Sequence, residues 1–76
     1  MNKQRRKRLE DLLKDIELLK TDLEDISSEE EEAFSNIPEN LQNSDRYYDC
    51  ENAVTSLSDA VYDIENCISN IESAME

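Results

Sequence analysis

Residues 51–76 read ENAVTSL, SDAVYDI, ENCISNI, ESAME when they are divided every seven positions. The larger apolar side chains from residue 50 onward are separated alternately by four and three positions. They are Cys50, Val54, Leu57, Val61, Ile64, Ile68, Ile71 and Met75. This spacing is the a/d pattern of a helix that packs along other helices. The stretch therefore predicts a long amphipathic helix over about residues 44–75.

A second column of small side chains runs beside this seam. Each of its members directly precedes an a position. The column consists of Ala53, Ala60, Cys67 and Ala74. Small residues allow a neighbouring backbone to approach closely, and they widen the apolar stripe to three positions per heptad. So wide a stripe indicates more than one neighbouring helix.

A first helix is expected over about residues 3–35, because an apolar seam also runs through this part of the chain. The seam consists of Leu9, Leu12, Ile16, Leu19, Leu23, Ile26 and Ala33. Its rhythm breaks at Glu30, and Leu13 and Phe34 widen it on one side. Ser27 and Ser28 could cap a new helix, but the seam keeps its phase across them, which favours one continuous helix.

Residues 36–43 are expected to connect the two helices, because Pro38 biases the residue before it away from helical angles. A short helical turn could begin at Pro38, and Asn43, Ser44 or Asp45 could cap the second helix. The sequence thus predicts one all-α domain over residues 1–76, an antiparallel two-helix hairpin. A single hairpin cannot cover both sides of such wide stripes, so we expect a homo-oligomer. A dimer that forms a four-helix bundle is the favoured form, and a larger helical oligomer is the alternative.

The composition excludes several classes of function. Twenty acidic residues against eight basic ones give a formal net charge of −12, which opposes direct binding to nucleic acid or to an anionic membrane. The absence of glycine removes Gly-rich phosphate loops, and the absence of histidine removes the commonest general base and transition-metal ligand. We therefore expect no enzyme activity, no cofactor and no metal site. With no signal-peptide segment or apolar run of membrane-spanning length, a cytoplasmic location is expected.

Two smaller features have structural interpretations. Residues 1–8 hold five of the eight basic residues and, in a hairpin, would lie beside Glu65, Glu72, Glu76 and the C-terminal carboxylate. Cys50 and Cys67 lie seventeen positions apart on one helix, about 25 Å, which is too far for a disulfide within the chain.

Two surfaces are candidates for binding a partner. The connector end combines amides, one cation and an aromatic ring that could contact a protein or a small nucleotide: Glu39, Asn40, Gln42, Arg46 and Tyr48. The other candidate is an acidic surface of the first helix, where a glutamate recurs every seven residues: Glu10, Glu17, Glu24 and Glu31. Such a surface could mimic nucleic acid towards a basic groove.

The segment EEEEAFSNIPENLQNSDRYYDCENAVTSLSDAVYDIENCISNIESA, residues 29–74, resembles a family of short acidic helical-hairpin proteins. These proteins are encoded by phages, prophages and conjugative elements of Gram-positive bacteria. The resemblance implies a mobile-element origin in a bacterial host but no particular activity. It favours a non-enzymatic protein that binds a host protein, such as an inhibitor of a CRISPR nuclease or of another defence system. The alternatives are an oligomeric sponge for a signalling nucleotide, a nucleic-acid mimic and a structural coiled-coil scaffold.

Overall fold

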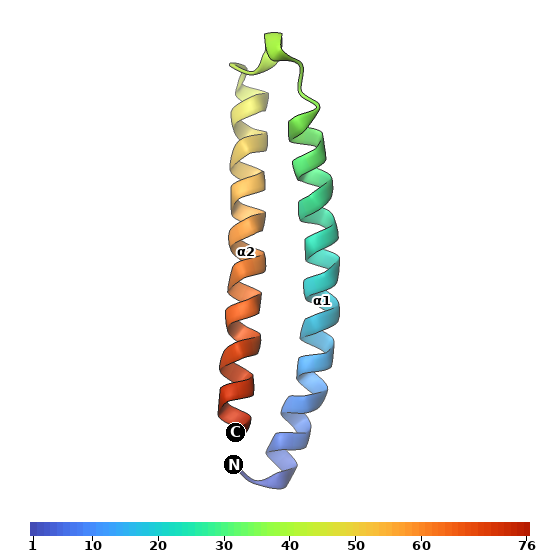
Figure 1. Ribbon diagram of the computed structural model, residues 1–76, viewed down its shortest axis with the longest axis vertical. Helices are drawn as coiled ribbons and strands as arrows, with labels where there is room; N and C mark the ends of the chain where they lie inside the picture. The colour runs from blue at the N-terminus through green and yellow to red at the C-terminus, as the bar shows by residue number, and fades with distance from the viewer.

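The protein is an antiparallel hairpin of two long helices, as the sequence predicted (Figure 1). The computed structural model describes all residues, 1–76. Helix α1 spans Lys3–Ser35, a 3-10 turn η1 spans Glu39–Leu41, and helix α2 spans Asp45–Met75. The molecule measures 59 × 15 × 13 Å, and both termini lie at the end opposite the connector.

Side-chain caps set the start of each helix. The side chain of Asn2 accepts a hydrogen bond of 2.8 Å from the backbone N–H of Arg5. Ser44 caps α2 by accepting a bond of 3.2 Å from the N–H of Tyr47, and its hydroxyl donates to the Leu41 carbonyl at 2.6 Å. Each cap satisfies an N–H that the first turn of a helix leaves without an internal partner. The Ser44 cap and the turn after Pro38 thus fix the reversal of the chain.

Helix α2 faces α1 with the columns that its periodicity predicted. Its half-buried side chains include Val54, Leu57, Val61, Ile64, Ile68 and Ile71. Ala53 and Ala60 of the second column are also half-buried, whereas Cys67 and Ala74 are exposed. The a/d assignment of α2 therefore describes its contact with α1.

Helix α1 faces α2 in a different phase from the predicted seam. Its least exposed positions also alternate by three and four: Leu9, Leu13, Ile16, Lys20, Leu23, Ser27, Glu30 and Phe34. Leu12, Leu19 and Ile26 of the predicted seam remain 51%, 60% and 53% exposed. Within the hairpin these three side chains are not core residues, and only an oligomer could give them a seam role. Leu9, Ile16 and Leu23 belong to both seams, but the hairpin pairs them with Leu13, Lys20, Ser27 and Phe34 in place of the expected Leu12, Leu19 and Ile26.

Three polar residues of α1 lie in the contact and find partners or space there. Lys20 Nζ lies 3.4 Å from Glu65 Oε1, and Glu30 Oε1 accepts a hydrogen bond of 3.2 Å from the Cys50 thiol. Ser27 is 6% exposed and is the one buried residue, and its small side chain suits a position where the helices are close. Helix α1 continues without interruption through the two serines, as expected.

The two ends of the hairpin close differently. At the connector end the rings of Phe34 and Tyr47 are in contact, with 4.9 Å between their centroids and 37° between their planes. At the open end Arg6 Nε donates a hydrogen bond of 3.2 Å to the Met75 carbonyl. The basic N-terminal segment thus reaches the C-terminus of α2, but the expected pairing with Glu65 is wrong, because that carboxylate pairs with Lys20.

The hairpin by itself has no hydrophobic core. No apolar side chain is fully buried, and the residues in the helix contact are only half covered. Each helix is covered along one line by its partner, and its remaining surface faces solvent. This arrangement leaves two long faces, one on each side of the plane that contains both helix axes.

Candidate interaction surfaces

The two faces follow from the antiparallel pairing of two heptad repeats. Antiparallel helices are related by a twofold axis perpendicular to the plane of the pair, so the same heptad position on both helices lies on the same side. With Leu13 and Val54 assigned to position a, the e positions of both helices line one face. The g positions of both helices line the opposite face.

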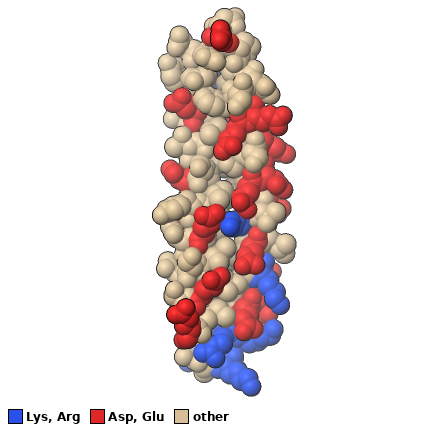
Figure 2. Space-filling model, viewed as in Figure 1, with Lys and Arg blue, Asp and Glu red and all other residues tan.

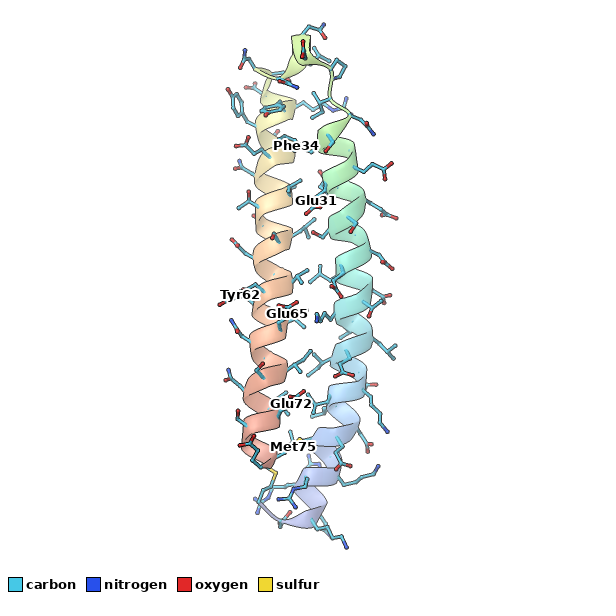
Figure 3. The ribbon with its side chains drawn as sticks, viewed as in Figure 1. Glu31, Phe34, Tyr62, Glu65, Glu72 and Met75 are labelled. Carbon is cyan, nitrogen blue, oxygen red and sulfur yellow. The ribbon has the colours of Figure 1, made fainter.

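The e positions form an acidic face. It consists of Glu10, Glu17, Glu24 and Glu31 of α1 with Glu51, Glu65 and Glu72 of α2. Figure 2 shows acidic atoms along both helices on this side, with basic atoms gathered at the end that holds the termini. Figure 3 labels Glu31, Glu65 and Glu72 along the line between the helices, and Tyr62 on the outer side of α2. The acidic surface expected on α1 is therefore extended by a second row from α2.

Few bases offset the acidic face. Lys20 lies between the two rows and pairs with Glu65, and Lys7 pairs with Asp11 at 3.2 Å. Exposed pairs of this kind contribute only about 0.2–1 kcal/mol each. Beyond Lys20 the chain has a single base, Arg46, so the negative potential is strongest on the half of the hairpin nearer the connector.

The g positions form an apolar face, which the sequence analysis did not recognise as a separate surface. It consists of Leu12, Leu19, Ile26 and Ala33 of α1 with Ala53, Ala60, Cys67 and Ala74 of α2. Leu9 connects the two columns at the open end, because it borders one hollow together with Leu12 and another together with Cys67 and Ala74. The available signals were the column of small residues on α2 and the column of the predicted α1 seam that holds Leu12, Leu19 and Ile26. That the two columns lie on one side becomes evident only from the antiparallel geometry.

The structure does not bring the predicted connector-end residues into one site. Glu39, Asn40 and Gln42 are exposed on η1 and just after it. Arg46 and Tyr48 lie two positions apart on α2, so their side chains project about 200° apart around its axis. Tyr48 is 49% exposed and makes an edge contact with Tyr47 on the side away from Arg46.

Arg46 instead borders an open hollow on the apolar side of the connector end. The other residues around the hollow are Glu30, Ala33, Ile37, Asp49 and Cys50. Desolvation beside α1 and the hydrogen bond to Glu30 raise the pKa of the Cys50 thiol, and the Arg46 charge opposes this only in part. The hollow thus holds two carboxylates against one guanidinium, which makes it unsuitable for a phosphate.

Because of the Cys50 thiol, the free energy of unfolding should vary with pH in the alkaline range. A group whose pKa is raised on folding contributes stability below its unfolded pKa, and this stability is lost as pH rises through the folded value. In a Cys67→Ser background we expect the free energy of unfolding to fall once the pH exceeds the ordinary thiol pKa of 9.0. Glu30→Gln removes the anionic acceptor, so it should lower the thiol pKa and weaken this dependence. Denaturant titrations from pH 7 to 10.5 measure both effects, and a pH dependence unchanged by Glu30→Gln contradicts them.

No group of three or more cysteine or carboxylate side chains is arranged to hold a metal ion. Neither helix combines the length and apolar character that crossing a bilayer requires. Both cysteines are free thiols.

Comparisons with models of known protein families, with curated proteins and with solved structures gave no match.

Proposed function

We propose that this chain is a non-enzymatic interaction protein of mobile-element type that binds a host protein through its acidic face. The partner would be a cytoplasmic nucleic-acid-handling protein with a basic groove, such as a CRISPR nuclease or another defence protein. Binding would occupy that groove and so inhibit the partner. The observation that supports the proposal is the presence of two rows of carboxylates on one side of the hairpin.

The charge density favours a protein groove as the target but not full imitation of a duplex. The net charge of −12 over a length of 59 Å is about one negative charge per 5 Å, against one per about 1.7 Å in duplex DNA. Successive glutamates in one row are about 10 Å apart, at seven residues of 1.5 Å rise. The acidic face can therefore pair with separated lysines and arginines of a groove, and the binding should weaken with salt.

A defence assay with matched variants tests this proposal. Expression of the chain in a bacterium that carries a CRISPR system should restore plating of a targeted phage. The triple variant E17Q/E24Q/E31Q removes three charges from the acidic face and should abolish the restoration. The control D15N/D22N/D25N removes the same number of charges from positions away from this face and should retain it.

Equal losses in both variants would show that only total charge matters. That outcome, or a wild-type chain that protects no phage against any defence system tried, contradicts the proposal.

A nucleotide sponge is the second candidate, and the connector end gives it limited support. Arg46 is the base available there, but Glu30 and Asp49 beside it would repel a phosphate. Calorimetry with cyclic nucleotides decides this point: tight binding that Arg46→Ala removes would favour the sponge over the protein inhibitor. If the chain is a scaffold without a ligand, the E17Q/E24Q/E31Q variant should behave like the wild-type chain in every assay.

A further inference from the structure

The apolar face is the feature of the hairpin that the proposed function leaves unexplained. Leucine and isoleucine side chains on it are more than half exposed, and the seam residues beneath it are only half covered. Exposed apolar strips of this length are uncommon on monomeric proteins and mark interaction surfaces. The acidic face on the opposite side cannot be buried in its place, because it carries the glutamates.

We propose that a second copy of this chain covers the apolar face, with its ends reversed, to form an antiparallel four-helix bundle. The face is at most 59 Å long and 15 Å wide, so it offers up to about 900 Å² per copy. A specific protein interface of standard size buries about 800 Å² on each partner. The available area therefore matches what a stable dimer needs.

The chemistry of the face selects a second copy over a membrane. Its rim carries Asp15 and Asp22 on α1 and Asp63 on α2, and the chain has a net charge of −12. An anionic bilayer would repel such a surface. A second hairpin supplies another straight apolar strip of equal length, with acidic rims that can remain in water.

The charges along α1 select the reversed orientation. With reversed ends, α1 lies beside α1 of the second copy, and Arg8 of one copy is level with the last turns of the other α1, near Glu29. The basic N-terminal segment then lies beside the run of four glutamates at residues 29–32. Each copy makes this contact once, so the attraction occurs at both ends of the dimer. Asp15 also lies beside Asp22 of the second copy twice in this orientation, so two attractive contacts stand against two repulsive ones.

The opposite orientation, with both connectors at one end, places α1 over α2 of the second copy. Residues at equal height then meet, as Phe34 and Tyr47 do within the hairpin. Glu29 would lie beside Asp49, and Asp15 beside Asp63, while both basic segments would gather at one end. The extent of burial does not decide between the orientations, because the leucine and alanine columns are buried in both.

Reversed pairing also has a consequence for the acidic face. Each hairpin turns its apolar face inwards, so the two acidic faces point outwards on opposite sides of the bundle. One dimer would thus present two copies of the acidic surface.

Engineered cysteines test the dimer and its orientation. In a C50A/C67A background, Ala60→Cys places a thiol near the middle of the α2 column, where reversed copies bring it beside its equivalent. Disulfides need Cβ atoms about 3.5–4.5 Å apart, so mild oxidation should give at least about tenfold more covalent dimer for A60C than for the outward-facing control Y62C. Circular dichroism of both variants checks that the hairpin is intact.

Spin labels provide a second measurement that leaves the interface unchanged. In the same background, labels on Asn2→Cys should be about 50 Å apart across a reversed dimer, the length of the 33-residue helix α1. A short distance between the Asn2→Cys labels overturns the reversed orientation. Covalent dimer that forms only when A60C and L19C chains are mixed overturns it as well. Absence of covalent dimer in every variant together with absence of any label-to-label distance overturns the dimer itself.

Discussion

Replacement of Leu19 with glutamate is expected to weaken self-association at least about 100-fold, because the dimer would have to bury an unpaired carboxylate twice. Leu19 is 60% exposed in the hairpin and lies in the middle of the apolar face. The substitution therefore leaves the contact between α1 and α2 in place and adds a charge only where the second copy lies. Since the hairpin alone has no buried apolar residue, its helix content should fall together with the dimer at micromolar concentration.

Leu18→Glu is the matched control for this substitution. Leu18 is one residue away and 68% exposed, but it lies on the outer side of α1, away from both faces. The same chemical change there should leave the dissociation constant within about twofold of the wild-type value. Sedimentation velocity over a concentration series measures the dissociation constants of both variants. Equal dissociation constants would show that the apolar face is not the site of association.

Leu23→Ala should cause the largest loss of stability among single truncations in the helix contact. Leu23 is half-buried against α2 near the centre of the hairpin, and it lies at the border of the apolar face. In the dimer it is covered from both sides, so its truncation removes transfer free energy and leaves a cavity. The expected cost is about 2–4 kcal/mol per chain.

Leu18→Ala is the control, because it removes the same atoms from an exposed position. Its effect on the free energy of unfolding should stay within about 0.5 kcal/mol. Urea titrations followed by circular dichroism give both values at one chain concentration. If Leu23→Ala cost no more than Leu18→Ala, the half-buried column of α1 would not be the contact that holds the hairpin.

Much of the architecture could be predicted because local signals agree with the fold. Pro38 ends the first helix region, Ser44 caps the second, and the absence of glycine excludes hairpin-rich sheet structures. The a/d columns of α2 are unambiguous, because the column beside them is occupied by small residues. These features depend on near neighbours in the chain, so one sequence is sufficient to interpret them.

The phase of α1 could not be predicted in the same way. Leu9, Ile16 and Leu23 fit two possible seams, one with Leu12, Leu19 and Ile26 and the other with Leu13, Lys20, Ser27 and Phe34. Both seams give the same four-and-three rhythm. The sequence pattern favoured Leu12 and Leu19, whereas the hairpin places Leu13 and Lys20 in the contact. The choice depends on long-range partners: Glu65 pairs with Lys20, and the Cys50 thiol donates to Glu30. Neither partner can be identified from the local spacing.

The predicted connector-end residues do not lie on one surface, for a geometric reason. Arg46 and Tyr48 are close in sequence, but two positions on a helix point to nearly opposite sides. The acidic face was only half foreseen, because the row on α2 is interrupted by Ser58 and becomes apparent only when α2 lies antiparallel to α1. Both surfaces are properties of the pair of helices and of neither helix alone.

Sedimentation equilibrium of the unmodified chain tests most directly whether two hairpins hide their apolar faces against each other. At tens of micromolar in about 0.15 M salt, where surface charges are screened beyond about 8 Å, the fitted mass should be twice the 8.8 kDa of one chain. A single species of 8.8 kDa that keeps its full helix content at this concentration would contradict the shared core and the bundle built on it.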